Sequence, residues 1–285
     1  MKDLAIHKLT KTSLDNFLAQ PSHAVMLTGA QGSGKFSLAT YLVEQTLGIK
    51  EGTFVDFAYG KILRPNDGKA IGIDAIRELD HFLSLKVPSQ KIFDRAVIIE
   101  DSHFLTLEAQ NALLKMLEEP PQGTLFILTA SYSQSLLPTI RSRTQIIDIT
   151  RPELQHLKDF FKAQGHDETA IKTAVAISGG LPGLMHAILS QEDHPLIAAT
   201  ERTRLLLSQP AYDRLLSVDE LSKQKQLARD ITFILKQMAH ISLLTAKGSS
   251  AKKWQVILNA SYEAGENLSK NGQAKLALTK LMLSL

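Results

Sequence analysis

The residues Gly29–Lys35, with the sequence GAQGSGK, constrain the fold of this chain more than any other segment. Their spacing matches the phosphate-binding pattern G-x-x-x-x-G-K. The apolar run Ala24–Leu27 precedes the segment and a helical pattern follows it. Glycines let successive backbone N–H groups point at a phosphate, and the helix that follows presents the positive end of its dipole. The segment therefore predicts a strand, a phosphate-binding loop and a helix in direct succession.

The same loop predicts a nucleotide site with an incomplete metal site. Lys35 is expected to reach the β- and γ-phosphates of ATP. The next position normally carries a hydroxyl that coordinates Mg²⁺, but here it is Phe36, which has no oxygen, and Ser37 points about 100° away around the helix. The sequence leaves ATP open as a ligand and predicts poor coordination of Mg²⁺. The candidate nucleotide-binding residues are Gly29, Gly32, Ser33, Gly34, Lys35 and Ser37.

Three further apolar runs, Ala96–Ile99, Leu125–Leu128 and Gln145–Ile149, alternate with helical patterns in the first half of the chain. Short apolar strands separated by helices are typical of a parallel sheet that is covered on both faces. The sequence therefore predicts an α/β fold with a parallel sheet for this half.

Two acidic residues, Glu100 and Asp101, directly follow the run Ala96–Ile99. A carboxylate at the end of a strand beside a phosphate loop can hold the metal or orient the attacking water. Both residues are therefore candidate catalytic groups. The alternative is an acidic, solvent-facing strand end, which is common in α/β proteins.

A helix is predicted after Thr106, which is a suitable N-cap residue, with Glu108 in the first turn, where a negative charge suits the helix dipole. Pro120 and Pro121 end it. The apolar residues that follow the spacing of one buried face are Ala109, Ala112, Leu113, Met116 and Leu117.

From Pro152 onward the sequence predicts helices alone, with breaks at Gly179–Gly183 and Gln191–Pro195. We expect three domains: a nucleotide-binding module at 1–150, a small helical domain at 151–192 and a larger helical domain at 193–285. The chain has no cysteine, which excludes disulfides, thiolate metal ligands and a cysteine nucleophile. It shows neither a signal peptide nor an apolar run of about 20 residues, so we expect a cytoplasmic protein.

The segment around residues 96–145 resembles the clamp-loader branch of the AAA+ ATPases. Two strings carry the likeness to the signature helix of that branch: NALLK at Asn111–Lys115 and LEEP at Leu117–Pro120. The stretch Leu136–Thr144, LLPTIRSRT, is similar to the Ser-Arg-Cys motif of the same branch, with Thr144 in place of the cysteine. Gly72–Leu79 and the closing stretch Asn271–Leu285 also fit the family.

The resemblance implies a RecA-like ATPase module, a helical lid at 151–192 and a C-terminal helical collar at 193–285 that assembles a hetero-pentameric ring. It implies gamma/tau-type and delta-type subunits as partners, with the sliding clamp and primer-template DNA reached through the complex. Arg143 stands at the position of the arginine finger that acts in trans on a neighbour's ATP, and Ser131 stands at the sensor position. The zinc module frequent in the family is absent, so no zinc is expected.

Departures from the family pattern resemble those of a delta-prime-type subunit, a non-polymerising member of the DNA-directed DNA polymerase III holoenzyme. Phe36 replaces the metal-binding hydroxyl, Glu100-Asp101 reverses the usual order of the acids, and Leu184 replaces a sensor arginine. Arg143 is retained. We therefore expect a subunit that helps to load the clamp and has weak or no ATPase activity of its own. The alternative is an ATP-hydrolysing gamma/tau-type motor, which the intact Gly34-Lys35 pair keeps open; the signature helix disfavours a stand-alone helicase or remodeller.

Overall fold

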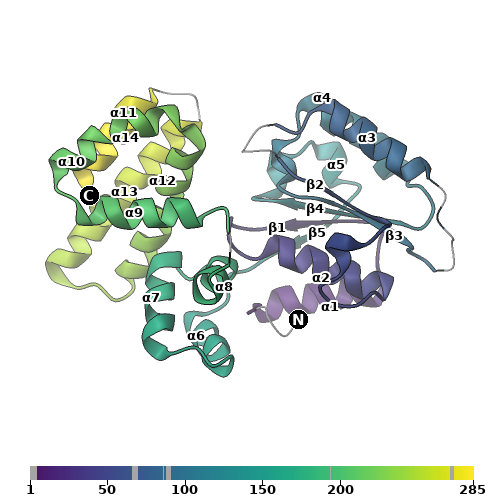
Figure 1. The fold of residues 1–285 in the computed structure, drawn as a ribbon, viewed down its shortest axis with the longest axis horizontal. Coiled ribbons are helices and arrows are strands. Elements are labelled where there is room, and N and C mark those ends of the chain that lie inside the picture. The colour runs from purple at the N-terminus through teal and green to yellow at the C-terminus, as the bar shows by residue number, and fades with distance from the viewer. Residues whose placement is uncertain (1–4, 66–69, 86, 88–90, 193, 270–272) are drawn as a thin grey trace. The chain divides into compact units, whose positions relative to one another are not determined.

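Five short strands form one parallel sheet in the computed structural model, which describes residues 5–65, 70–85, 87, 91–192, 194–269 and 273–285 (Figure 1). The strands are β1 (Ala24–Thr28), β2 (Gly60–Leu63), β3 (Arg95–Ile99), β4 (Thr124–Ala130) and β5 (Gln145–Asp148). Their order is β2-β3-β4-β1-β5, and every neighbouring pair is parallel. The four runs predicted as strands are confirmed. The short edge strand β2, with the sequence GKIL, was not predicted.

Helices cover both faces of this sheet, as Figure 1 shows. On one face lie α1 (Lys8–Ala19) and α2 (Lys35–Leu47), and on the other lie α3 (Ile73–Ser84), α4 (Leu107–Glu118) and α5 (Pro138–Arg141). Short 3-10 turns occur at Phe54–Asp56, Ser102–Phe104 and Ser133–Ser135. Strands β1, β3 and β4 are buried along their whole length, because both faces are packed against apolar helix surfaces.

The helix predicted after Thr106 is confirmed. The Thr106 hydroxyl accepts a hydrogen bond from the backbone N–H of Ala109 at 3.2 Å, which satisfies one of the amides at the start of α4. Of the predicted apolar face, Ala109, Leu113, Met116 and Leu117 are buried and Ala112 is partly buried. The helix ends at Glu118, two residues before the first proline.

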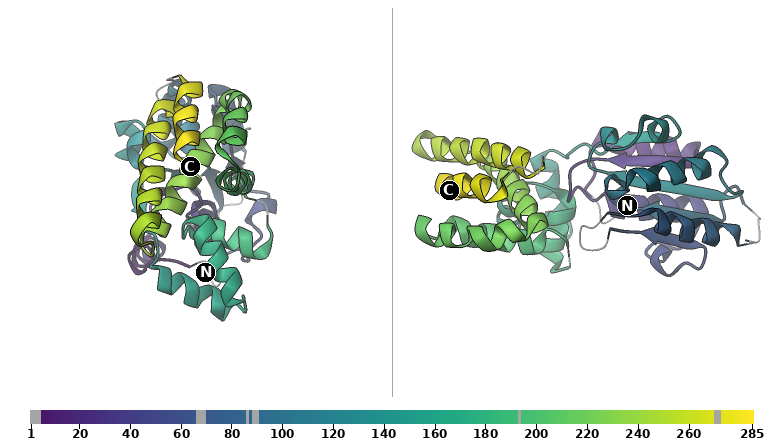
Figure 2. Two further views of the ribbon diagram at one scale, coloured as in Figure 1. Left: turned by 90° about the vertical axis from the view of Figure 1, so that its left-hand side faces the viewer. Right: turned by 90° about the horizontal axis from the view of Figure 1, so that it is seen from above.

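The chain divides into two compact units, Met1–Pro152 and Glu153–Leu285. In the described part of the second unit every secondary-structure element is a helix: α6 (Leu154–Ala163), α7 (Glu168–Ser178), α8 (Pro182–Ser190), α9 (Ile197–Ser208), α10 (Ala211–Leu216), α11 (Val218–Lys223), α12 (Lys225–Leu243), α13 (Gly248–Ser269) and α14 (Ala274–Ser284). Helix α13 packs against both α12 and α14 (Figure 2). The predicted fold class, a parallel α/β module followed by a helical C-terminal region, is confirmed.

The further division of the helical unit at residue 192 stays a prediction. Helices α6, α7 and α8 belong to the same compact unit as α12, and α7 packs directly against α12. Residues 271–272 of the closing stretch lie outside the described residues. None of the described helices has the length and hydropathy needed to span a membrane.

Candidate functional sites

The phosphate loop lies between β1 and α2, at the carboxyl edge of the sheet. Its first residue is tied to the neighbouring strand, since the N–H of Gly29 donates to the carbonyl of Ala130 at 3.1 Å. Gly32 and Gly34 have φ angles of 76° and 87°, a left-handed conformation that glycine adopts without steric cost. This backbone allows the loop to curl ahead of the first turn of α2, which is the geometry of an anion-binding loop.

Lys35 is buried against the loop itself. Its Nζ donates to the carbonyl oxygens of Gly29 and Ala30, each at 3.0 Å. Burial lowers the pKa of the ammonium group, and the carboxylates of Asp101 and Glu100 oppose that shift. A phosphate entering the loop would have to take over the hydrogen bonds that Lys35 makes to these carbonyls.

Ser33 is the second polar group of the loop. It is only 9% exposed, and its Oγ has no hydrogen-bond partner among the described residues. The hydroxyl faces Gly29, where an added Cβ would lie 3.3 Å from it. A buried hydroxyl without a partner costs free energy, and a phosphate oxygen in the loop would satisfy it. This orphan donor and the curled backbone together fit a phosphate group.

The residues around the expected metal position do not fit Mg²⁺. Arg64 lies with its Nε 2.8 Å from Oε2 of Glu100 and its Cζ 4.5 Å from the centre of the Phe36 ring. Burial raises the pKa of Glu100, and the charge of Arg64 partly opposes this shift. Ser37 is exposed, one residue farther along α2. A metal ion here would need the Glu100 carboxylate as a ligand, but that carboxylate is paired with Arg64, and the neighbouring Phe36 ring offers no oxygen. Arg64 follows β2 in the chain and belongs to no motif, so the sequence does not indicate its place in this site.

The other predicted residues of this site gather at the same edge of the sheet. Glu100 and Asp101 follow β3, and Ser131 follows β4, directly after the residue that anchors Gly29. Asp101 has a φ of 46°, and its N–H donates to the Thr129 hydroxyl at 2.9 Å. Parallel strands end at one edge, so β1, β3 and β4 bring the loop, the acids and Ser131 together.

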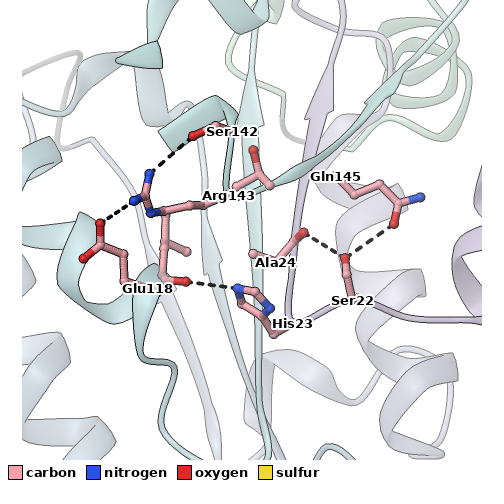
Figure 3. Close-up of a pocket in the computed structure, with 9 residues that line it drawn as sticks. Ser22, His23, Ala24, Glu118, Ser142, Arg143 and Gln145 are labelled. Carbon is pink, nitrogen blue, oxygen red and sulfur yellow. Dashed lines mark hydrogen bonds and ion pairs between the residues drawn. The ribbon is translucent and has the colours of Figure 1, made fainter. Parts of the chain in front are cut away.

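Arg143 lies at the amino ends of the parallel strands, whereas the phosphate loop lies at their carboxyl ends. It lines a cavity of about 600 Å³ together with Ser22, His23, Ala24, Leu117, Glu118, Ser142, Thr144 and Gln145 (Figure 3). The residues Ser22–Ala24 lead into β1, whereas Gly29 follows its end, so the strand length of about 13 Å separates the two sites. Arg143 is therefore remote from the chain's own phosphate loop.

The guanidinium group of Arg143 is held by neighbouring acceptors within the first unit. Its Nη2 lies 2.6 Å from Oε1 of Glu118, and its Nη1 donates to the carbonyl of Thr139 at 3.0 Å and to the Ser142 hydroxyl at 3.3 Å. Figure 3 shows the side chain between Glu118 and Ser142. Thr144, at the cysteine position of the motif, is buried, and its hydroxyl donates to the carbonyl of Ile140. The arginine remains partly exposed, so an anion from outside can reach it.

A family model described as DNA polymerase III, delta subunit, matches residues 5–153 of the chain. DNA polymerase III subunit delta' of Haemophilus influenzae is 31% identical over 177 residues, which are 56% of this chain and 53% of the relative. The corresponding subunit of Escherichia coli is 30% identical over 60% of this chain and 55% of its own length. DNA polymerase III subunit tau of Bacillus subtilis is 31% identical over 50% of this chain and 27% of its own length.

The match to these curated relatives spans about half of the length of the two delta' subunits. Among solved structures, a DNA polymerase III gamma subunit-related protein of Thermotoga maritima matches 97% of this chain and 98% of its own, with a TM-score of 0.52 and 18% identity. At 18% identity this likeness concerns the fold alone.

Proposed function

Because the chain belongs to the DNA polymerase III delta subunit family, we propose that it is a delta-prime-like subunit of a bacterial clamp loader. It helps to load the sliding clamp onto primed DNA during replication. Its partners are gamma/tau-type and delta-type subunits in a hetero-pentameric ring, and it reaches the clamp and primer-template DNA through that complex. Residues 151–192 act as a helical lid and residues 193–285 as the collar that joins the ring.

The position of Arg143 supports a catalytic role toward a neighbouring subunit. The residue lies at the amino ends of the strands, away from the chain's own loop at their carboxyl ends, and its side chain remains partly exposed. A guanidinium group is always charged and offers a planar fork of donors to phosphate oxygens. In the proposed ring, Arg143 stabilises the charge that moves during phosphoryl transfer on the neighbour's ATP.

Three features support weak or absent hydrolysis by the chain itself. Phe36 offers no oxygen to a metal, and Glu100 is paired with Arg64 at 2.8 Å. Leu184, at the position of a sensor arginine, is fully buried in the helical unit, where it packs as a core residue. Asp101 and Ser131 lie at the same edge of the sheet as the loop, where a carboxylate contributes to phosphoryl transfer chiefly by holding a metal ion or orienting the attacking water.

The experiment is a comparison of Arg143→Ala and Lys35→Ala in the reconstituted clamp loader, with DNA-stimulated ATPase as the readout. Arg143→Ala should reduce the rate in part, because the other subunit interfaces keep their own arginines. Arg143→Lys, which retains the charge but loses the planar fork, should be intermediate. Size-exclusion chromatography should show that all three variants enter the complex as the wild type does.

A gamma/tau-type motor is the second candidate. The intact Gly34-Lys35 pair and the 31% identity to the Bacillus subtilis tau subunit favour it. The same experiment separates the two, because Lys35→Ala would then lower the ATPase rate as much as Arg143→Ala, with assembly unchanged. That result would refute the delta-prime-like function.

A further inference from the structure

Arg64 touches both positions at which a phosphate loop of this type would hold its metal ion. The residue after the loop lysine, Phe36, lies under the guanidinium with 4.5 Å between Cζ and the ring centre. The first acid after β3, Glu100, lies 2.8 Å from Nε. These two residues are far apart in the sequence and from different elements, so their joint contact with one arginine defines a three-residue cluster beside the loop.

The charges of this cluster match those of a metal site. Glu100 provides a partly buried carboxylate, and a guanidinium group supplies a permanent positive charge next to it. The Phe36 ring, which packs against the core of the α2 face, offers its negative π-face to the cation. The guanidinium of Arg64 thus lies beside the start of α2, where Phe36 stands in place of the hydroxyl that would coordinate Mg²⁺.

The cluster alone is compatible with a simple surface ion pair, and a second observation points to a ligand. The Ser33 hydroxyl lies in the adjoining loop, more than nine-tenths buried and without a partner among the described residues. Arg64 is about half exposed, and among the described residues its other guanidinium nitrogens have no hydrogen-bond partner. One buried donor and one exposed fork of donors therefore remain for an anion near the loop.

We propose that Arg64 is a tethered cation that replaces Mg²⁺ in this site, so that the loop binds the polyphosphate of a nucleotide in its metal-free form. The curled backbone and Ser33 contact one phosphate group, and Arg64 neutralises the next. Mg²⁺ gives no advantage, since its ligand position is the Phe36 ring and Glu100 is already paired. This is a binding property of the isolated chain, separate from its function in a complex.

The test is the binding of a fluorescent ATP analogue to the isolated full-length protein, followed by anisotropy in excess EDTA and in excess Mg²⁺. The wild type should bind in EDTA with a Kd no higher than in Mg²⁺, and inorganic tripolyphosphate should compete. Arg64→Gln should raise the Kd in EDTA about tenfold or more, the change expected for the loss of a charge-assisted hydrogen bond. The double variant Phe36→Thr, Arg64→Gln should instead bind more tightly in Mg²⁺ than in EDTA.

Arg77→Gln is the matched control, because Arg77 is an exposed arginine paired with Asp74 on α3, on the opposite face of the sheet. It should leave the Kd unchanged under both conditions, and circular dichroism should show all variants folded. The proposal is overturned if the wild type fails to bind in EDTA, if it binds more tightly in Mg²⁺, or if Arg64→Gln behaves as Arg77→Gln does. A double variant that gains no preference for Mg²⁺ would also count against it.

Discussion

The Nη2 atom of Arg143 lies 2.6 Å from Oε1 of Glu118. The two residues belong to the two segments that resemble clamp-loader motifs, the LEEP end of α4 and the Ser-Arg-Thr turn before β5. The side chain of Glu118 is 49% exposed, and that of Arg143 is 34% exposed. An ion pair with this exposure contributes about 0.2–1 kcal/mol, so Glu118 restrains the arginine without locking it.

Removing this restraint tests the part that Glu118 plays in the proposed function. Glu118→Gln keeps the shape of the side chain but loses its charge. The Arg143 side chain should then leave this contact at a lower cost in free energy when it turns toward a neighbour's phosphate. We expect the DNA-stimulated ATPase of the reconstituted complex to rise by up to about fivefold, the equivalent of the ion-pair energy. Glu119→Gln, at the adjacent exposed position, is the control and should have no effect. A fall in rate with Glu118→Gln would mean that the acid positions the arginine for catalysis.

The pair of Arg64 and Glu100 predicts an unusual dependence of stability on pH. Burial raises the pKa of Glu100 above its ordinary value, so the folded chain binds the proton more readily than the unfolded chain. The stability that this group contributes is therefore fully present below its unfolded pKa of about 4.3 and is lost as the pH rises through the folded value. At neutral pH the ionised carboxylate lowers the free energy of unfolding.

Glu100→Gln should consequently be more stable than the wild type at neutral pH, because it removes the buried charge and still accepts a hydrogen bond from Arg64. The difference should shrink as the pH is lowered toward about 4.3. Urea unfolding of both proteins at a series of pH values measures this difference. A variant that is less stable than the wild type at neutral pH would show that the attraction to Arg64 outweighs the cost of burial.

The N-cap of α4 gives a stability prediction for the first unit. Thr106→Ala removes the acceptor for the Ala109 N–H and should lower the free energy of unfolding by about 0.5–2 kcal/mol. Thr12→Ala is a suitable control, because the Thr12 hydroxyl is exposed within α1 and donates only to the carbonyl of Lys8. Urea unfolding should give a lower free energy of unfolding for Thr106→Ala than for Thr12→Ala. Equal stabilities would mean that tertiary packing alone fixes the start of α4.

Local signals made much of the fold predictable. Thr106 is a typical N-cap residue placed directly before an apolar helical pattern. The runs at β1, β3 and β4 are apolar throughout because all three strands are fully buried. Strand β2 escaped prediction because it has only two apolar residues and lies at the edge of the sheet, where it is less buried.

The candidate sites were predictable only where the residues belong to a contiguous motif. The phosphate loop, Glu100 and Arg143 stand in such motifs. Arg64 contacts residues of two other elements, α2 and the end of β3, and no spacing in the sequence indicates that they meet. The same holds for Glu118, whose position in a helix motif does not reveal that its side chain reaches the Ser-Arg-Thr turn.

The helical unit depends on a close approach between two helices. Gly179, at the end of α7, has a φ of 64°, and a Cβ there would lie 2.4 Å from the Cβ of Gln237 on α12. Two backbone atoms of Gln237, its carbonyl carbon and oxygen, would lie 2.8 and 2.9 Å away. Such contacts cannot be relieved by a side-chain rotation, so a larger residue must shift one helix relative to the other.

Gly179→Ala should therefore destabilise this unit through both the left-handed backbone and the clash. Gly165→Ala separates the two effects, because Gly165 has a φ of 90° but nothing within 4 Å of an added Cβ. The control should lose about 1–2 kcal/mol from the backbone conformation alone. Gly179→Ala should lose more, and urea unfolding followed by far-ultraviolet circular dichroism measures both. If the two variants lost the same free energy, α7 and α12 would have room to move apart, and their contact would contribute little to holding these helices in one unit.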